Sequence, residues 1–373
     1  MKVLHVTTGM RKASGVTTFV ENVTAELRRR GVEVAVVMKE TDLTSCDIVH
    51  IHGLWSPLLH RASKWARQRG IPVVWSTHGM TAPWSMRHKW WKKLPAWLLY
   101  QKRDLKRAAA IHCTTDLEVE WNQALGFKNC FVAPLGTRLP DSAAGLGRRS
   151  GSTAEGRTLL FVGRIYPVKA LDQLIEAFAR VDESVRRNWV LRLVGPDQAG
   201  HMAELMALCD RLGLTYSTPE QNGKDSTVDL DLRPRPQVEF AGPKFNEGLD
   251  AEYANCDCLA LVSHTENFGA TVVDAMAHGK PVITSTKTPW KVVADNKCGW
   301  WVDNDVATLT AALREVCGME GLRAPRADAP SGDLTVGGYL PEMGRRGREL
   351  VRAHYTWSAV CDKMLRGYEE VVR

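Results

Sequence analysis

The sequence predicts an α/β protein that consists of two doubly wound parallel sheets in tandem. The chain has 373 residues, and since single cores stop growing near ~250 to 300 residues, two domains are the default. Short β-branched or apolar runs alternate with amphipathic segments, which is the pattern of repeated βαβ units. A polar, Gly-rich run at residues 141–151 interrupts this alternation, which then resumes.

The first domain is expected over residues 1–140. Its first helix is predicted at residues 16–27, where apolar side chains recur at helical spacing, and three arginines followed by Gly31 mark its C-terminal end. Strands are predicted at residues 3–7, 32–38, 47–52, 73–77, 109–113 and 130–133.

A linker is expected at residues 141–157 and the second domain at 158–353. Its strands are predicted at 158–162, 190–194, 238–241, 258–262 and 282–284, and its helices at 168–181, 202–212 and 271–277. Residues 217–236 and 318–340 are polar or rich in Gly and Pro, which favours surface insertions. Within the last segment, 354–373, apolar side chains at helical spacing predict an amphipathic helix over 357–371.

The composition excludes several classes of protein. With 44% hydrophobic and 24% charged residues, the chain is not disordered, collagenous or a disulfide scaffold. Nine cysteines, an odd number without a CxxC pair, and a first strand directly after Lys2 predict a reducing cytoplasm. No apolar run approaches the ~18 residues of a spanning helix. The net charge of +7 suits phosphorylated molecules, an anionic membrane or nucleic acid equally.

The turn after the strand at 158–162 carries cations. Ligands bind at the carboxyl ends of strands in open α/β sheets, and this turn contains Gly163, Arg164 and Lys169. We place Lys169 in the first turn of the next helix, where a cation opposes the helix dipole unless an anion is bound. Gly163 permits close backbone approach and Arg164 can grip phosphate oxygens, which favours a diphosphate ligand. The alternative is a solvated lysine and an arginine in a surface ion pair.

The turn after the strand at 258–262 carries two carboxylates, Glu266 and Asp274, on either side of a Gly-containing helix start. Carboxylates repel phosphate but accept hydrogen bonds from hydroxyls, so we expect contacts with a ribose or another sugar. Backbone N–H groups at residues 268–270 are candidates for polar ligand atoms. The alternative is that both acids only complement the helix dipole.

Together these motifs resemble the signature of the family 4 retaining glycosyltransferases of the GT-B fold, and the resemblance covers nearly the whole chain. The matching residues are Gly163-Arg164, Lys169, Glu266-Asn267-Phe268-Gly269, Asp274 and Gly279-Lys280-Pro281-Val282. Asp274 departs from the family, which usually has a second glutamate there. The resemblance implies two Rossmann-like domains facing a cleft, an acceptor-binding one first and a donor-binding one second. It also implies that residues 354–373 cross back as a helix onto the first domain.

The resemblance also implies roles. Arg164 and Lys169 would hold the donor diphosphate and neutralise the leaving phosphate, and Glu266 would contact the hydroxyls of the donor sugar. Gly163 and the backbone of Asn267, Phe268, Gly269 and Ala270 would touch sugar and phosphate, and Asp274 would bind ribose. Retention in this family is ascribed to attack from the front face, which needs no glycosidase-like pair of carboxylates.

Two turns of the first domain complete the predicted site. His78 follows the strand at 73–77 and precedes a glycine; in similar enzymes this histidine faces the donor sugar, so His78 is a catalytic candidate, although a lone histidine is more often structural. The first βα turn resembles the family's glycine loop beside the donor phosphates. Ser14 stands where its first glycine is usual, so only Gly15 is carried over.

A metal centre is not predicted. His50 and His52 share one face of a strand, but two imidazoles without a third ligand make a weak case. Asp229-Leu230-Asp231 and Asp303-Asn304-Asp305 match the DxD pattern of other transferases, yet both lie away from the turns above. We expect no cofactor, with a UDP- or GDP-sugar as the donor substrate.

Residues 83–107 interleave four tryptophans with lysines and arginines. Such a segment can lie on an anionic bilayer with its tryptophans at headgroup depth, which would place a cytoplasmic protein on the inner face of the membrane. The alternative is a core helix with inward tryptophans and solvated cations.

The predicted activity is retaining transfer of a hexose from a nucleotide-diphosphate sugar to a saccharide or lipid-linked acceptor, in surface polysaccharide or glycolipid biosynthesis. A nucleotide-sugar epimerase of the same fold and a non-catalytic, membrane-docked scaffold stay open as alternatives. A nucleic-acid partner is not expected, because no recognition motif accompanies the basic residues. A dinucleotide dehydrogenase is disfavoured, because neither first βα turn carries GxGxxG.

Overall fold

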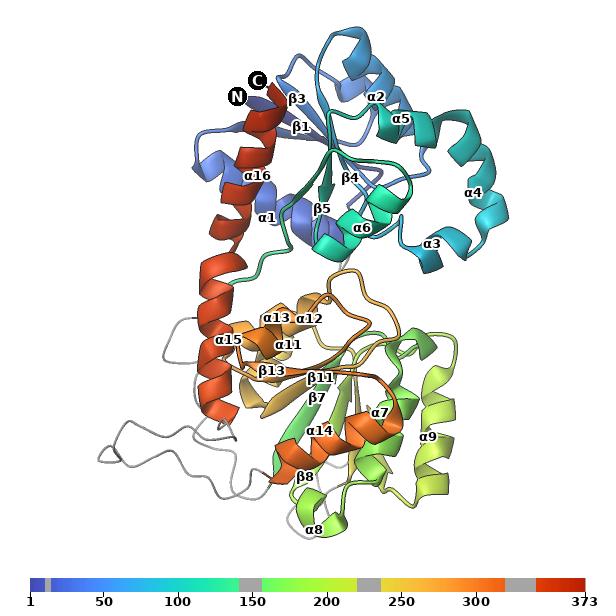
Figure 1. Cartoon of the computed structure of the whole chain (residues 1–373), viewed down its shortest axis with the longest axis vertical. Helices are drawn as coiled ribbons and strands as arrows, with labels where there is room; N and C mark the ends of the chain where they lie inside the picture. The colour runs from blue at the N-terminus through green and yellow to red at the C-terminus, as the bar shows by residue number, and fades with distance from the viewer. Residues whose placement is uncertain (11–14, 141–155, 220–235, 319–339, 373) are drawn as a thin grey trace, which may run out of the picture. The chain divides into compact units, whose positions relative to one another are not determined.

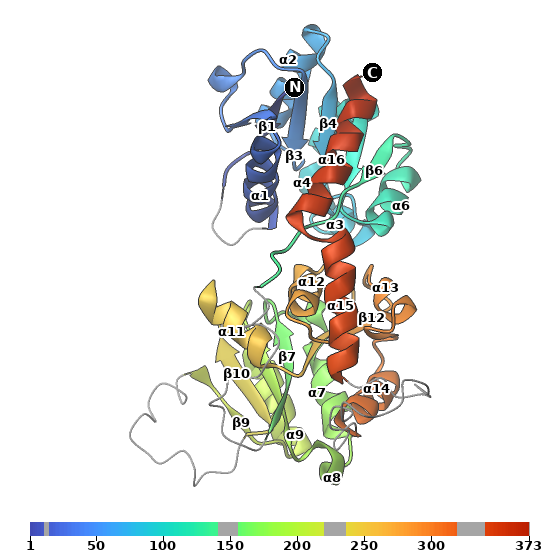
Figure 2. The same ribbon diagram turned by 90° about the vertical axis from the view of Figure 1, so that its left-hand side faces the viewer.

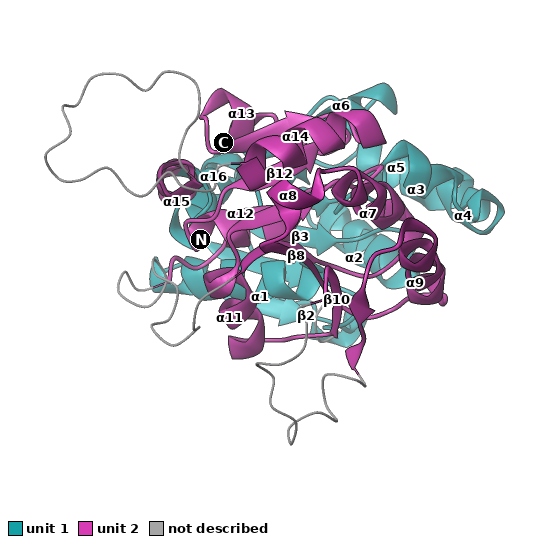
Figure 3. Cartoon of the chain, turned by 90° about the horizontal axis from the view of Figure 1, so that it is seen from below, with its two compact units in different colours: residues 1–136, 354–373 teal, residues 137–353 magenta. Residues whose placement is uncertain are grey.

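A computed structural model describes residues 1–10, 15–140, 156–219, 236–318 and 340–372. The chain forms two compact units (Figure 3): unit 1 comprises Met1–Gly136 and His354–Arg373, and unit 2 comprises Thr137–Ala353. Most of the predicted linker and of the two predicted insertions, and Asp229 and Asp231, lie outside the described residues.

Unit 1 contains a six-stranded parallel sheet in the order β2-β1-β3-β4-β5-β6. Its strands are β1 (Lys2–Val6), β2 (Glu33–Val37), β3 (Ile48–His52), β4 (Val73–Ser76), β5 (Ala110–Cys113) and β6 (Cys130–Val132). Its helices are α1 (Gly15–Arg29), η1 (Glu40–Asp42), α2 (Pro57–Gln68), α3 (Pro83–Arg87), α4 (Trp90–Ala96), the π-helix η2 (Trp97–Gln101), α5 (Lys102–Lys106), α6 (Asp116–Ala124) and α16 (Trp357–Val372).

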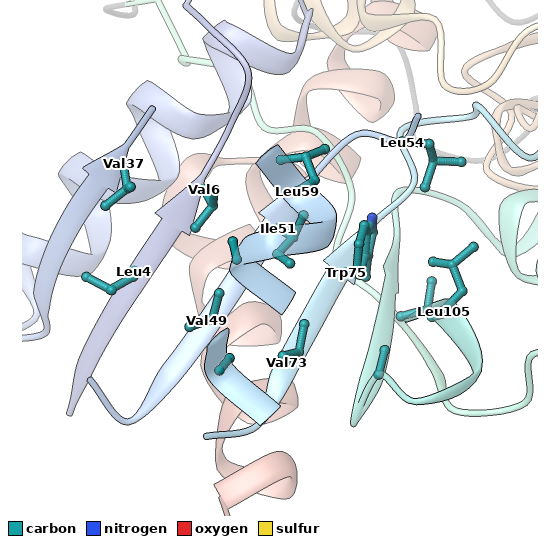
Figure 4. Packing of buried hydrophobic residues seen from close by; sticks show 14 of the residues in the cluster. Leu4, Val6, Val37, Val49, Ile51, Leu54, Leu59, Val73, Trp75 and Leu105 are labelled. Atoms are coloured by element: carbon teal, nitrogen blue, oxygen red, sulfur yellow. The ribbon is translucent and has the colours of Figure 1, made fainter. Parts of the chain in front are cut away.

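One face of this sheet is wholly apolar and lies under α2 and α5. Side chains alternate between faces along a strand, so Leu4, Val6, Val49, Ile51 and Trp75 all point to this side (Figure 4). Removing each such side chain from water stabilises the fold by about 1.5 to 3 kcal/mol.

The opposite face lies under α1 and α16, which contact each other (Figures 1 and 2). Val360, Met364 and Tyr368 of α16 are completely buried there beside Phe19 of α1. The expected C-terminal helix that returns to the first domain is therefore confirmed. This face also carries several polar side chains, which are described below.

Unit 2 contains a seven-stranded parallel sheet in the order β13-β12-β11-β7-β8-β10-β9. Its strands are β7 (Arg157–Val162), β8 (Trp189–Val194), β9 (Tyr216–Ser217), β10 (Val238–Gly242), β11 (Cys258–Leu261), β12 (Val282–Ser285) and β13 (Gly299–Val302). Its helices are η3 (Pro167–Lys169), α7 (Leu171–Ala179), α8 (Glu183–Arg186), α9 (His201–Leu212), α11 (Glu247–Asn255), α12 (Ala270–Ala277), α13 (Val292–Asp295), α14 (Val306–Gly318) and α15 (Leu340–His354).

The predicted α/β class with two parallel sheets is confirmed, and the structure differs locally from the prediction in its edge strands and in one helix. Edge strands β9 and β13 were not predicted, and the helix expected at 168–181 is divided into η3 and α7. The division falls at Ala170, whose φ of +53° cannot continue a right-handed helix. Among the described helices, none is both long and apolar enough to cross a bilayer.

Candidate functional site

In unit 2, the turns that follow the central strands β7 and β8 are joined to each other. Gly163 and Gly195 lie side by side at the ends of these strands, and a Cβ on Gly195 would stand 2.7 Å from the carbonyl carbon of Gly163. Beyond them, the Ile165 N–H donates to Pro196 O at 2.9 Å and the Gln198 N–H donates to Ile165 O at 3.0 Å. The turn that carries Arg164 and Lys169 is therefore held by backbone bonds on its β8 side.

The predicted cation Lys169 and the predicted carboxylate Glu266 meet, although 97 residues separate them. Lys169 Nζ lies 2.5 Å from Glu266 Oε2, and the two side chains are only 14% and 18% exposed. The Ser263 hydroxyl also donates to Glu266 Oε2, at 3.4 Å. An N–H of the following residue, His264, donates to Val168 O at 2.9 Å and so ties the two turns together.

The predicted position of Lys169 in the first turn of a helix is wrong. Lys169 closes the short 3-10 turn η3, and α7 begins two residues later at Leu171. Ala170, fully buried and left-handed, turns the chain between them. The α7 dipole therefore does not explain the lysine, and its partner is the Glu266 carboxylate instead.

Arg164 is exposed, whereas Lys169, the other cation of this turn, is paired with Glu266. One guanidinium N–H donates to Gln198 Oε1 at 2.6 Å, and the guanidinium lies 5.9 Å from the centre of the Tyr166 ring. Arg164 makes no ion pair with any described residue, so the surface ion pair considered as an alternative is not formed within that part of the chain. Its remaining N–H donors can turn to an anionic ligand.

The segment from Asn267 to Ala270 presents its backbone at the start of α12. The Phe268 ring is buried edge-on against Trp290, with ring centres 5.1 Å apart, and the Trp290 indole N–H donates to Phe268 O. Gly269 has a φ of +78°, and a Cβ there would lie 2.7 Å from Leu261 Cδ2. Packing thus explains why Phe and Gly stand here, and it leaves backbone rather than side chains at the helix start.

Asp274 lies on α12, and its side chain bonds to Thr137 instead of to Lys169, the partner of Glu266. The Thr137 hydroxyl donates to Asp274 Oδ1 at 2.6 Å. Burial raises the pKa of the Asp274 carboxyl to about 6, although the Thr137 bond acts in the opposite direction. Arg348 of α15 joins the end of α12 to the segment after Thr137, because its guanidinium donates to Ala277 O and, at 2.6 Å, to Pro140 O.

In unit 1, His78 stands in a tight turn after β4, with a φ of +48°. Burial lowers the pKa of His78 to about 4, although the charge of Glu118 opposes this. His78 Nε2 lies 3.1 Å from His52 Nδ1. Its ring also meets Phe19 of α1 edge-on, with centres 5.6 Å apart. Gly15 itself begins α1, the helix that carries Phe19.

Glu118 holds the His78 turn and was not predicted. Its fully buried carboxylate accepts hydrogen bonds from the Thr77 hydroxyl at 2.6 Å and the Gly79 N–H at 2.5 Å. It also accepts from the N–H and hydroxyl of Thr114, at 2.7 and 2.9 Å. A signal was present in the sequence: Thr115 and Glu118 have the spacing of a capping box, and Thr115 Oγ1 does accept the Glu118 N–H at 3.1 Å.

A third histidine lies beside His50 and His52 on their face of the sheet, which the sequence pattern did not indicate. His5 of β1 pairs in register with His50, and ligand-capable atoms of the three rings lie within 4.8 Å of one another. All three rings are buried. The sequence could not show this neighbour, because the pairing of β1 with β3 brings together residues 45 positions apart.

Comparison with known proteins shows which family this chain belongs to. The model of glycosyl transferases group 1 matches residues 148–327, and the model of glycosyltransferase family 4 matches residues 38–139. The chain belongs to the family 4 glycosyltransferases. The two matches together span most of the chain and include all the predicted site residues except Gly15.

Curated relatives of this family 4 member carry the name D-inositol 3-phosphate glycosyltransferase. The protein of Nocardioides sp. is 29% identical over 295 residues, which cover 74% of this chain and 61% of the relative. That of Geodermatophilus obscurus is 30% identical over 217 residues, which cover 55% of this chain and 44% of the relative. The matched part of this chain thus spans about two fifths to three fifths of the length of these relatives.

Solved structures confirm the GT-B fold of this chain. Sucrose-phosphate synthase from Thermosynechococcus elongatus has a TM-score of 0.69 with 17% identity, covering 99% of this chain and 98% of that one. HepE from Anabaena, solved with UDP and glucose, has a TM-score of 0.66 with 14% identity, covering 98% of each chain. At these identities the likeness shows the fold alone.

Proposed function

We propose that the protein is a retaining glycosyltransferase that moves a hexose from a UDP- or GDP-sugar to a saccharide or lipid-linked acceptor. The observation that carries the proposal is the ion pair of Lys169 and Glu266, two side chains with little exposure at the carboxyl ends of β7 and β11. A cation for phosphate and a carboxylate for sugar hydroxyls are the two groups that a nucleotide-sugar donor requires.

Donor binding would exchange the partner of Lys169. A diphosphate carries more charge than one carboxylate, so Lys169 Nζ would turn to it together with Arg164, whose guanidinium makes no ion pair with a described residue. Glu266 would then accept hydrogen bonds from the hexose hydroxyls. Asp274 would accept from the ribose, and the backbone from Asn267 to Ala270 would bind the groups between them.

The transfer itself would use the charge on the leaving group. The bond from the anomeric carbon to the β-phosphate oxygen breaks, and a bond from the same carbon to the acceptor oxygen forms on the same face. The proton of the acceptor hydroxyl passes to the departing phosphate oxygen. Lys169 and Arg164 would stabilise the charge that develops there, which is usually the largest single contribution to catalysis. His78 stays the catalytic candidate of unit 1. The proposal uses no metal ion.

A donor panel tests the proposal. We would measure thermal stabilisation of the protein by UDP- and GDP-hexoses, and then incubate the stabilising donor with candidate acceptors, including D-inositol 3-phosphate, which occurs in the names of the relatives. Proton NMR of the product should show the anomeric configuration of the donor. An inverted product would refute retention, and consumption of the donor without an acceptor would favour an epimerase. Stabilisation without any turnover would favour a non-catalytic scaffold.

Donor affinity is expected to fall as the pH is lowered through about 6. The pKa of Asp274 is raised to about 6 by burial, so below that pH its carboxyl group is mostly protonated. Ribose hydroxyls bond more strongly to the ionised form, which means that donor binding lowers this pKa and releases a proton. Isothermal titration at about pH 5 and about pH 7.5 should show up to about tenfold weaker binding per pH unit below the pKa.

The variant Asp274→Asn is the control for this pH dependence. It keeps the shape of the side chain and an oxygen that can accept the Thr137 bond, but it cannot titrate. Its donor affinity should be lower at neutral pH and the same at both pH values. An unchanged pH dependence in this variant would assign the effect to another group.

We also propose that residues 83–107 rest on an anionic membrane, where the acceptor would be lipid-linked. The inward-facing alternative is wrong for most of the apolar side chains: Trp90 and Trp91 of α4 are 58% and 61% exposed, and Leu98 and Leu99 of η2 are 71% and 73% exposed. Of the four tryptophans, Trp97 packs against the core of unit 1, and Leu105 of α5 belongs to that core. Exposed lysines and arginines on α3, α4 and α5 accompany them, which is the composition of an interfacial segment.

Vesicle flotation tests this contact. The protein should float with vesicles that contain phosphatidylserine, and Lys89→Glu with Lys92→Glu should weaken the association at least about 30-fold, at ~1 kcal/mol for each lysine lost. Lys93 is left intact, because its ammonium donates to Ser85 O inside the segment. The control, Lys287→Glu with Lys297→Glu on exposed positions of unit 2, changes the net charge equally. Equal binding by both variants would exclude this segment as the contact.

A further inference from the structure

A continuous run of hydrogen-bonded side chains crosses the sheet of unit 1 on the face under α1 and α16. We call it the histidine chain. Its members, in order, are His78, His52, His5, Tyr368, His50, Ser76 and His112, and it ends at the carbonyl oxygen of Ala133. Except for His78, which is half-buried, every member is at most 2% exposed.

Strand pairing explains why these residues share one face. His5 is in register with His50, His52 with Ser76, and Ser76 with His112. His50 and His52 are two residues apart, so all five strand positions point to the same side of the sheet. Phe19 of α1 stacks on His112, with ring centres 5.2 Å apart, and Tyr368 comes from α16.

The number of donors and acceptors on each group fixes the direction of the hydrogen bonds in the histidine chain. A neutral imidazole has one N–H donor and one bare nitrogen acceptor, and a carbonyl oxygen can only accept. His112 Nε2, 2.7 Å from Ala133 O, must therefore carry the proton, and its bare Nδ1 must accept from the Ser76 hydroxyl at 2.6 Å. Ser76 Oγ then accepts from His50 Nε2 at 2.6 Å.

The same reasoning continues through α16 to the edge of the sheet. His50 Nδ1 is bare and accepts from the Tyr368 hydroxyl at 2.5 Å, so Tyr368 Oη can only accept from His5 Nε2, at 3.5 Å. His5 Nδ1 then accepts from His52 Nε2 at 2.8 Å. His52 Nδ1 in turn accepts from His78 Nε2 at 3.1 Å.

We infer that the histidine chain fixes His78 as the tautomer protonated at Nε2, so that its bare Nδ1 is offered as a hydrogen-bond acceptor to a substrate hydroxyl. His78 would thus accept a hydrogen bond from a substrate hydroxyl and would not act as a general acid. His112, Ser76, His50, Tyr368, His5 and His52 would be positioning residues that act through it. The role toward substrate rests on the proposed function, whereas the tautomer does not.

Two further observations support the assignment, the first for neutral rings and the second for the direction of the hydrogen bonds. Burial lowers the pKa of His5 to about 3, and it also lowers the pKa values of His50, His52 and His112. If the hydrogen bonds of the histidine chain ran in the reverse direction, His112 would be protonated at Nδ1, and its bare Nε2 would face the carbonyl oxygen of Ala133, which is also an acceptor. A buried imidazolium at His112 would be needed to avoid this conflict.

A metal ion at His5, His50 and His52 is the competing explanation, and the distances disfavour it. Zinc at ~2.0 to 2.1 Å from each nitrogen would separate the nitrogens by about 3.3 Å in a tetrahedral site. His5 Nδ1 and His52 Nε2 are 2.8 Å apart, and every ring nitrogen of the three residues already has a hydrogen-bond partner.

Nitrogen NMR of ¹⁵N-histidine-labelled protein reads the tautomers directly, since protonated and bare ring nitrogens have well separated shifts. In the wild type, all five rings should be protonated at Nε2. Tyr368→Phe removes one oxygen and should leave His50 and His112 unchanged, while His5, His52 and His78 should populate both tautomers. Ser76→Ala interrupts the histidine chain closer to Ala133. His50 should then also populate both tautomers, and only His112 should keep its single tautomer. Tyr100→Phe, which changes a tyrosine that is not part of the histidine chain, should alter none of the five tautomers.

Three results would overturn the inference: Nδ1 protonation of His78 in the wild type, an unchanged His78 in both variants, or a stoichiometric metal ion in the purified protein. With a transferase assay in hand, Tyr368→Phe should lower kcat about 2- to 10-fold, the value of one hydrogen bond, with little change in KM for the donor. If the wild type transfers no sugar, the proposed function fails and the tautomer pattern still decides the inference.

Discussion

Replacing Lys169 by alanine is expected to lower kcat/KM for the nucleotide sugar by about 100- to 1,000-fold, the usual effect of removing one preorganised group that stabilises developing charge. Lys169 Nζ is held 2.5 Å from Glu266 Oε2 in a site where both side chains are largely shielded from water. A charge in such a place interacts more strongly than one in solvent. Steady-state kinetics with the donor selected by the panel would measure the loss.

Two causes of that loss can be separated. Alanine at position 169 removes the phosphate ligand, but it also leaves the Glu266 carboxylate without its cation. If the stranded carboxylate were the cause, Lys169→Ala combined with Glu266→Ala would recover activity. We expect no recovery, because both groups would bind donor. Lys291→Ala, which breaks the exposed ion pair of Lys291 with Asp295, removes the same charge from unit 2 and should leave the kinetics unchanged.

Lys169→Arg gives a further distinction. It keeps the positive charge and can still pair with a carboxylate, but its planar guanidinium is larger than an ammonium group. Partial activity in this variant, between those of wild type and Lys169→Ala, would agree with an electrostatic role. Activity of Lys169→Ala near that of wild type would refute the placement of the diphosphate at this turn.

The central strands and the meeting of Lys169 with Glu266 were predictable from the sequence for one physical reason. Parallel βαβ units bring the carboxyl ends of their strands to one edge, so residues that directly follow two neighbouring strands come close whatever their separation in the chain. β7 and β11 are such neighbours. Apolar runs of four to six residues located both strands to within one residue at each end.

Features that depend on a single backbone angle or on strand register were not predictable. Ala170 is a residue that favours helices, yet it adopts a φ of +53° and moves Lys169 out of α7. The helical spacing around Tyr368 predicted a buried helix face, but no local pattern indicates that its hydroxyl meets His50, 318 residues away. Glu118 carried a capping-box signal, and the same carboxylate also serves a turn 39 residues away.

The glycine at position 195 is expected to be as important to the donor site as the charged residues, although it contacts no substrate in the proposal. Its φ is +150°, and a Cβ there would overlap the carbonyl oxygen of Gly163 and lie 2.7 Å from its carbon. Both atoms are backbone, so the conflict cannot be relieved by a side-chain movement. Strands β7 and β8 would have to separate at the point where the Arg164–Lys169 turn begins.

Gly195→Ala should therefore destabilise unit 2 by about 3 to 5 kcal/mol and abolish thermal stabilisation by the donor, because overpacking against backbone joins a strained φ. Gly200→Ala is the matched control in the same unit: its φ is +75°, but a Cβ would meet nothing within 4 Å. That variant should lose only about 1 to 2 kcal/mol, the cost of a left-handed alanine. Denaturant unfolding measures both. If the two variants lost equal stability, the close approach of Gly163 and Gly195 would not be what sets the geometry of this turn.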